Sequence, residues 1–206
     1  MGSTQLTKDS YGLLLRKLLS LFSLEWIVTL FGIYRDLREL LAHGQGMYEI
    51  IEYDSSLKLA DATGKTAVFK RQQKVRFLQN HVIAFQDHVW GEGDLFAGYR
   101  VSPGIEADRY REGNHWNVLI SLRETKSKGD VEDFYIERTV KNGFAKKEEW
   151  WQVGIWCRTH KLKLSTLFPR DRHCKRAILQ TRSDNKTVVL GPEHFQILPS
   201  GQQLLR

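Results

Sequence analysis

The feature that most constrains the fold is a change in the spacing of apolar residues near residue 46. Over residues 10–42, apolar side chains recur every three or four positions, which is the pattern of an amphipathic helix. From Met47 onward, apolar and polar residues alternate, as in strands with one buried face. Gly44 and Gly46 lie between the two patterns and favour the end of a helix. We therefore expect an amphipathic helical lead over 1–46 and a β domain over 47–206.

The helical lead has one continuous apolar stripe, and a break near Ser23 would divide it into a helical pair. The stripe consists of Leu15, Leu19, Phe22, Trp26, Leu30, Ile33, Leu37 and Leu41. The 17 residues from Leu18 to Tyr34 contain one charge, Glu25, but a membrane span needs about 20 apolar residues and a central carboxylate is costly. We expect the stripe to pack on its own sheet, a protein partner or a second copy as a homo-oligomer, with a membrane surface as the less favoured alternative.

The β domain shows strand patterns separated by turn residues. In 115–123, Val118, Ile120 and Leu122 point one way, with Leu119 as an exception. Asn142-Gly143 predicts a two-residue hairpin turn that leads into Phe144 and the residues after it. The expected strands are 49–53, 57–60, 66–78, 81–90, 115–123, 131–141, 150–168 (a pair or one bent strand), 175–181, 187–190 and 195–198. About nine to ten strands favour an antiparallel β-barrel or β-sandwich, so the expected class is α+β.

The net charge of +7 is concentrated in one stretch of the chain. Residues 158–186 contain nine basic and two acidic side chains, so the rest of the chain is neutral. A local basic field attracts phosphate groups, acidic lipid or an acidic protein face. The alternatives are that these side chains protect strand edges, or that Glu132, Asp133, Glu148 and Glu149 neutralise them. The candidate anion-binding residues here are Arg158, Lys161, Lys163, Arg170, Arg172 and Arg176.

A second candidate site is the polar stretch 108–115, which we interpret as a loop. Arg109 and Arg111, together with His115, have the chemistry to clamp a phosphate or carboxylate. Tyr110 is suited to stacking on a base. The alternative is that the arginines pair with acidic neighbours in the same stretch.

Two groups of residues have the donor atoms of a metal site. Asp87, His88, Glu92 and Asp94 carry ligands for Mg²⁺ or Ca²⁺, although Gly-Glu-Gly-Asp is also typical of a solvated turn. Cys157, His160, His173 and Cys174 carry zinc ligands, although the adjacency of the last two strains joint ligation. A disulfide between the two cysteines is the other alternative. We expect idle thiols, no bound metal and no cofactor.

No glycine-rich phosphate loop, HExxH, GxSxG or Ser–His–Asp arrangement is present. By architecture alone, a helical lead before a β domain is similar to bacterial membrane-linked sensors, whose β domain binds a small ligand. We therefore expect a non-enzymatic ligand-binding or sensor module that takes an anionic, phosphate-bearing small molecule or nucleotide. The alternatives are a nucleic-acid-binding β domain and a metal-dependent enzyme that uses the 87–94 loop. The expected location is cytoplasmic, with peripheral membrane attachment as an alternative.

Overall fold

The computed structural model describes residues 46–182 and 184–206, and the expected helix over 10–42 lies outside them. The described residues form strands and one short 3₁₀ helix, so the expected α+β class is wrong for this part of the chain, which is a β structure. The strands are β1 (Tyr48–Leu59), β2 (Thr66–Phe77), β3 (Val82–Val89), β4 (Asp94–Ser102), β5 (Ile105–Glu112), β6 (His115–Lys126), β7 (Val131–Lys141), β8 (Thr159–Phe168), β9 (Ala177–Thr181), β10 (Lys186–Leu190), β11 (Phe195–Ile197) and β12 (Gln203–Leu205), and the 3₁₀ helix η1 is Pro192–His194.

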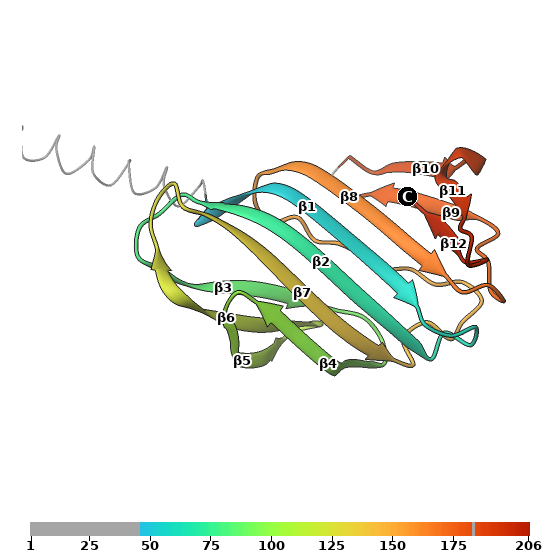
Figure 1. Ribbon diagram of the computed structural model, residues 1–206, viewed down its shortest axis with the longest axis horizontal. Coiled ribbons are helices and arrows are strands. Elements are labelled where there is room, and N and C mark those ends of the chain that lie inside the picture. Colours follow the sequence, from blue (N-terminus) through green and yellow to red (C-terminus); the bar gives the residue numbers. More distant parts are fainter. Residues whose placement is uncertain (1–45, 183) are drawn as a thin grey trace, which may run out of the picture. The chain divides into compact units, whose positions relative to one another are not determined.

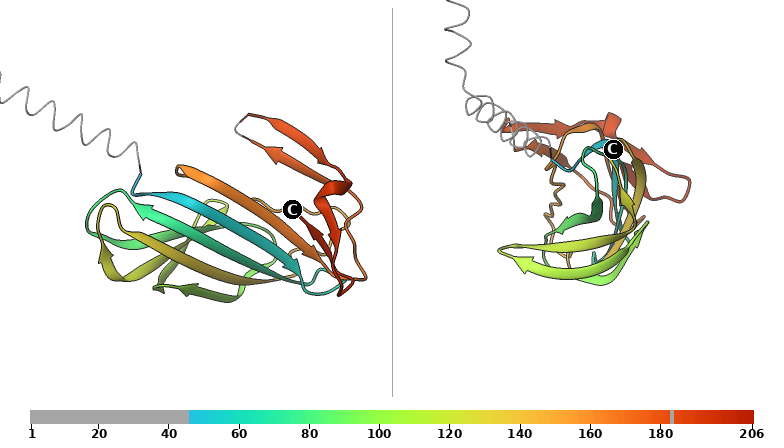
Figure 2. Two further views of the ribbon diagram at one scale, coloured as in Figure 1. Left: turned by 45° about the horizontal axis from the view of Figure 1, so that its top comes forward. Right: turned by 90° about the vertical axis from the view of Figure 1, so that its left-hand side faces the viewer.

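The strands form two large layers and a small hairpin (Figure 1). The larger sheet has seven strands in the order β11-β12-β8-β1-β2-β7-β4. The smaller sheet has three strands in the order β3-β6-β5 and lies against one face of the larger sheet. The β9–β10 hairpin forms a separate two-stranded sheet that stands apart from both layers (Figure 2).

This arrangement corrects two further expectations. Neither large sheet closes on itself, so the barrel alternative is wrong and the two layers pack in the manner of a sandwich. The pairing is also not wholly antiparallel, because β1 runs parallel to β8, with Ile50 opposite Thr159 and Lys58 opposite Leu167. The described residues contain twelve strands rather than nine or ten.

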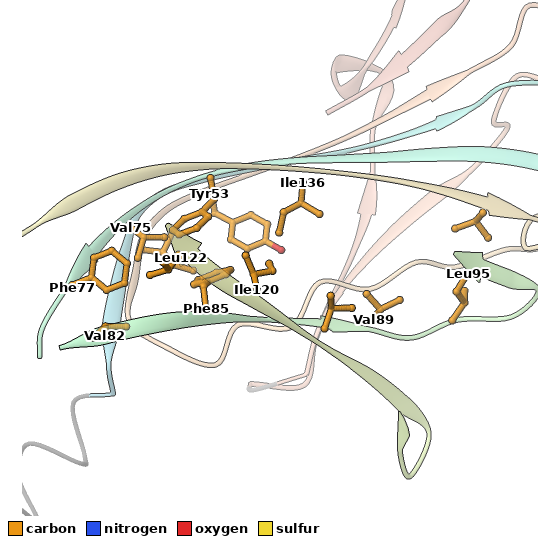
Figure 3. Packing of buried hydrophobic residues seen from close by; sticks show 14 residues of the cluster. Tyr53, Val75, Phe77, Val82, Phe85, Val89, Leu95, Ile120, Leu122 and Ile136 are labelled. Atoms are coloured by element: carbon orange, nitrogen blue, oxygen red, sulfur yellow. The ribbon is translucent and has the colours of Figure 1, made fainter. Parts of the chain in front are cut away.

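The core lies between the two sheets, where the alternating residues of both layers meet. Val75 and Phe77 of β2 are fully buried, and so are Val118 and Ile120 of β6, as the alternation predicted. The rings of Phe85 and Phe134 stack across the layers with centroids 4.4 Å apart. Figure 3 shows side chains from the larger sheet pointing toward those of the smaller sheet.

Several boundaries differ from those expected. The strand over 131–141 is confirmed, whereas 49–53 and 57–60 are parts of one strand, β1. The stretch 108–115 was interpreted as a loop, but most of it belongs to β5. Its outward residues are charged and it is an edge strand, so it lacks an apolar face that would mark it in the sequence.

The expected hairpin at Asn142-Gly143 does not form. Asn142 has a left-handed φ of 58°, but residues 142–158, all of which the structure describes, contain no strand. Phe144 instead packs on the β1–β2 turn, where a Cβ on Gly64 would lie 1.8 Å from the Phe144 carbonyl oxygen. The close approach requires glycine at position 64, which also has a φ of +70°. The irregular segment 142–158 then crosses toward β8 and lines the space beside the core.

Candidate anion-binding cavity between the sheets

Polar side chains occupy inward positions on three strands that are otherwise apolar on that face. On β2, Arg71 and Gln73 continue the row that ends in Val75 and Phe77. On β7, Arg138 lies in the same row as Phe134 and Ile136. On β3 of the opposite sheet, Asp87 lies between the buried Phe85 and Val89. The two-residue period of a strand therefore carries these polar groups into the interior.

Asp87 is the acidic member of this group and is paired across the layers. Its Oδ1 accepts a hydrogen bond from Arg71 Nη2 at 2.7 Å, and its Oδ2 accepts one from the Tyr99 hydroxyl at 3.0 Å. The Asp87 side chain is 4% exposed and that of Arg71 is 18% exposed. The carboxylate is thus buried with both oxygens bonded, which is what a charge needs to remain ionised inside a protein.

Arg138 is the second cation in the cavity and has no carboxylate of its own. Its guanidinium lies 4.6 Å from the centre of the Phe69 ring. Its Nη1 is buried and has no hydrogen-bond partner among the described residues. A buried donor without a partner costs about 1–3 kcal/mol, so this arrangement is expensive unless something else occupies the position.

Three more buried polar atoms beside Arg138 lack partners within the described part of the chain. They are Arg71 Nε, Trp90 Nε1 and Gln73 Oε1. Gln73 is only 4% exposed, so solvent outside the fold does not serve its amide. All of these residues line one cavity of about 90 Å³ between the sheets. Such a volume has room for several waters, or for one phosphate or carboxylate group.

The electrostatics of the cavity favour an anion. Burial disfavours the charge on Arg71, but Asp87 and then Tyr53 outweigh it, so the pKa of Arg71 is raised. Burial lowers the pKa of Arg138 to about 10, opposed by Asp87 and reinforced by Arg71, so this guanidinium is still cationic at neutral pH. Two cations therefore face one carboxylate, and the excess positive charge has no acidic partner among the residues that the structure describes.

A second cavity of about 90 Å³ adjoins the first. The two share Phe69, Trp90, Arg138, Trp151 and Gln152 in their walls. The wall that covers both is formed by segment 142–158, which side chains of neighbouring elements help to fix. Arg172 donates hydrogen bonds to the carbonyl oxygens of Phe144 at 2.8 Å and Lys146 at 2.6 Å. Trp151 Nε1 donates to Thr166 Oγ1 at 3.1 Å.

The candidate residues of stretch 108–115 are placed outside this cavity. Arg109 forms an ion pair with Glu106 at 2.7 Å and covers the Phe96 ring at 3.7 Å from its centre. Arg111 bonds to the Gly113 carbonyl, and Tyr110 accepts a hydrogen bond from Gln86. His115 lies 3.8 Å from Glu112. The arginines are thus engaged within or beside their own strand, and they do not converge on one point with His115.

The candidate residues of the basic window 158–186 are spread over several elements. On β8, Lys161 lies 3.7 Å from Glu52 and Lys163 lies 2.7 Å from Asp54, both on the neighbouring β1. Arg172 holds segment 142–158, as described above. The exposed Arg158, Arg170 and Arg176 lie outside the strands. The acidic partners of the two lysines therefore come from β1 and not from the glutamates and aspartate that the sequence suggested.

Neither group of potential metal ligands comes together in the described residues. Asp87 points into the cavity, His88 Nδ1 bonds to Asn117 at 2.7 Å, and Glu92 pairs with Lys146. Asp94 caps the Phe96 amide. Cys157 and Cys174 are both free thiols, and no group of three or more His, Cys, Asp or Glu residues in this part of the chain is placed to hold a metal ion.

Sequence reasoning missed the cavity arginines and named Asp87 only as a potential metal ligand, although a signal for Arg138 is present. Phe134, Ile136 and Val140 mark the inward face of β7, and Arg138 occupies the same face. A basic residue at an inward position of an alternating strand is the pattern that marks such a site.

In residues 46–182 and 184–206, no helix is long and apolar enough to cross a membrane.

Comparisons with known proteins give weak likenesses in fold. No protein-family model and no curated protein matches the chain. The M1 zinc metallopeptidase from Deinococcus radiodurans is similar with a TM-score of 0.46 at 9% identity, over 78% of this chain and 38% of that chain. Legionella pneumophila aminopeptidase A in complex with aspartic acid is similar with a TM-score of 0.42 at 11% identity, over 77% of this chain and 19% of that chain. This chain thus spans less than two fifths of the length of either protein, and likeness at this level supports no inference about function.

Proposed function

We propose that the β domain is a non-enzymatic ligand-binding module that takes the phosphate or carboxylate group of a small molecule in the cavity between the sheets. The observation that carries this proposal is Arg138, a half-buried cation whose buried Nη1 has no partner among the described residues and which shares its cavity with Arg71 and a single carboxylate. An anion there would accept from Arg138 Nη1 and Arg71 Nε in charge-assisted hydrogen bonds. Arginine is well suited to this task because its planar fork matches both anions.

The test is thermal unfolding and calorimetric titration of the full chain with inorganic phosphate and with acetate. Binding to the native state stabilises it by RT ln(1 + L/Kd) at ligand concentration L, so the melting temperature rises with the logarithm of the ligand concentration above Kd. We expect this shift in the wild type and its loss in Arg138→Met, which keeps much of the side-chain volume.

Arg100→Met is the matched control. Arg100 lies on β4, opposite Glu137 of β7. Glu137 directly precedes Arg138 in that strand, but its ion pair with Arg100 lies on the exposed face of the sheet. The control should retain the full shift. Equal shifts in both variants, or no shift in the wild type with either anion, would overturn the proposal.

The other functions suggested by the sequence stay predictions. Binding of single-stranded nucleic acid uses aromatic rings on which the bases stack. Trp150 and Trp156 have exposed rings of this kind, with 63% and 75% of each residue accessible. The metal-dependent enzyme has no converging ligand set in the described residues. The expected cytoplasmic location and the partner of the helical lead are also untested predictions.

A further inference from the structure

The second cavity differs in character from the first, and the difference indicates what the rest of the ligand is. Its walls include five aromatic rings, those of Phe69, Trp90, Phe144, Trp150 and Trp151. The Phe69 ring packs 5.9 Å from those of both Phe144 and Trp151, centre to centre, and the Arg138 guanidinium lies over it. The electron-rich faces offered to a ligand are therefore those of the other rings.

The rim of the second cavity is acidic. Glu92, Glu148 and Glu149 line it together with one lysine, Lys146. The Lys146 ammonium pairs with Glu92, and its main-chain amide donates to Glu149. Glu148 has no hydrogen bond or ion pair within the part of the chain that the structure describes. Arg138 of the shared wall also lines this cavity, so three glutamates face two cationic side chains, and the balance of charge is opposite in sign to that of the first cavity.

Two buried polar atoms without partners in the described residues favour a ligand in the joined cavities. The Gln73 amide oxygen is buried, faces the first cavity and has no partner in the described residues. Trp90 Nε1 is also buried without a partner, and Trp90 lines both cavities. An acceptor atom between two charged ends of a ligand, such as an ester oxygen, would satisfy this indole N–H.

Resting on the function proposed above, we propose that the ligand is a zwitterion with an anionic group at Arg71 and Arg138 and an ammonium group in the second cavity. Aromatic faces beside carboxylates are the surroundings that ammonium ions, including quaternary ones, prefer. A simple anion would leave the acidic rim and its tryptophans unused, and a simple cation would leave the two arginines uncompensated. The chemistry is shared by soluble amino-phosphate esters and by the headgroups of zwitterionic phospholipids.

The probe is phosphocholine, compared by calorimetry with 3,3-dimethylbutyl phosphate, in which carbon replaces the charged nitrogen, and with inorganic phosphate. We expect phosphocholine to bind about tenfold more tightly than its carbon analogue, because the two differ in the cationic contact alone. Equal affinity for the two, with inorganic phosphate still bound, would overturn the zwitterion while leaving the anion site in place. If none of the three ligands binds, the anion site itself is overturned.

A variant locates the ammonium group. Glu92→Gln/Glu148→Gln removes two rim charges without changing shape, and phosphocholine should then bind no better than its carbon analogue, while the affinity for inorganic phosphate is retained. The matched control is Glu124→Gln, whose side chain is 83% exposed at the end of β6 outside both cavities. Retained discrimination in the rim variant would contradict the assignment.

Flotation with phosphatidylcholine vesicles distinguishes a lipid headgroup from a free phosphate ester as the source of the zwitterion. Vesicle binding that soluble phosphocholine competes away supports a lipid headgroup, whereas soluble binding without vesicle binding supports a free phosphate ester. Vesicle binding that phosphocholine does not affect, combined with no soluble binding, contradicts the proposal.

Discussion

Two neighbouring residues of β7, Glu137 and Arg138, face opposite sides of the larger sheet and have opposite surroundings. Glu137 on the outer face accepts a hydrogen bond from the Tyr135 hydroxyl at 2.6 Å and pairs with Arg100 and Lys70. Arg138 on the inner face lies over the Phe69 ring, and its buried Nη1 has no hydrogen-bond partner in the described residues. The outer face thus satisfies its charge with side chains of adjacent strands, although water would also serve it.

The inner face leaves a charge unsatisfied in the place where water helps least. An unsatisfied polar group is costly inside a protein and nearly free of cost on its surface. Stability alone would favour the reverse arrangement, with the partnered charge inside and the unpartnered charge on the surface. The proposed ligand would supply the partner that Arg138 lacks in the described residues, and four experiments examine this contrast, beginning with the largest expected effect.

Arg71→Met should destabilise the domain most strongly. It leaves the Asp87 carboxylate buried with the Tyr99 hydroxyl alone, and breaking a buried ion pair from one side costs about 3–5 kcal/mol. Urea unfolding followed by tryptophan fluorescence measures the loss. A change below about 1 kcal/mol would show that Asp87 is not committed to this pair, since surface ion pairs have values of that size.

Arg138→Met should leave the free energy of unfolding unchanged or raise it by up to about 1 kcal/mol, because it removes a buried charge that lacks a partner. The same urea titration, in a buffer free of phosphate and carboxylates, gives the value. A loss as large as that of Arg71→Met would mean that Arg138 is a structural residue, and the contrast between the two faces would fail.

Glu137→Gln should lower stability by about 1 kcal/mol at neutral pH, the scale of an exposed ion-pair network. Hydrogen bonds from Tyr135 and Arg100 lower the pKa of Glu137 from 4.5 to about 2. Its contribution is therefore complete above pH 4.5 and is lost as the pH falls from 4.5 to 2. Unfolding measured across this range should show the wild type and the variant converging at the acid end, and a constant difference would contradict the assigned pKa.

Lys161→Gln/Lys163→Gln should have the smallest effect. These lysines pair with Glu52 and Asp54 on an exposed face, and such pairs are worth about 0–1 kcal/mol. We also expect unchanged phosphate binding by calorimetry. Lost binding here, with binding retained in Arg138→Met, would move the anion site from the cavity to the basic window.

Alternation in the sequence predicted several of the strands that have one apolar face, although it missed β4, whose Leu95 is buried in the core. The strand over 131–141 and the inward row Val118, Ile120 and Leu122 were found in this way. The edge strand β5 was missed because its exposed faces carry no such row. The short β12 was missed because three residues are too few to show a period.

The candidate site was harder to predict because it depends on which strands of the two sheets face each other. Arg71 and Asp87 are brought together only when β2 and β3 lie in different sheets that face each other. A count of local charge instead drew attention to residues 158–186, where basic side chains are adjacent in sequence. In the structure, some of these are balanced by β1, which lies more than a hundred residues earlier.

The parallel pairing of β1 with β8 also determines the order in which the domain can assemble. Strand β1 can pair with β2 as soon as both have left the ribosome, but its other edge stays open until residues 159–168 emerge. Contacts of such long separation slow folding, and an open edge invites pairing with other chains. The nascent domain is therefore most exposed to aggregation while β2 to β7 are being synthesised, and the arrival of β8 ends that interval.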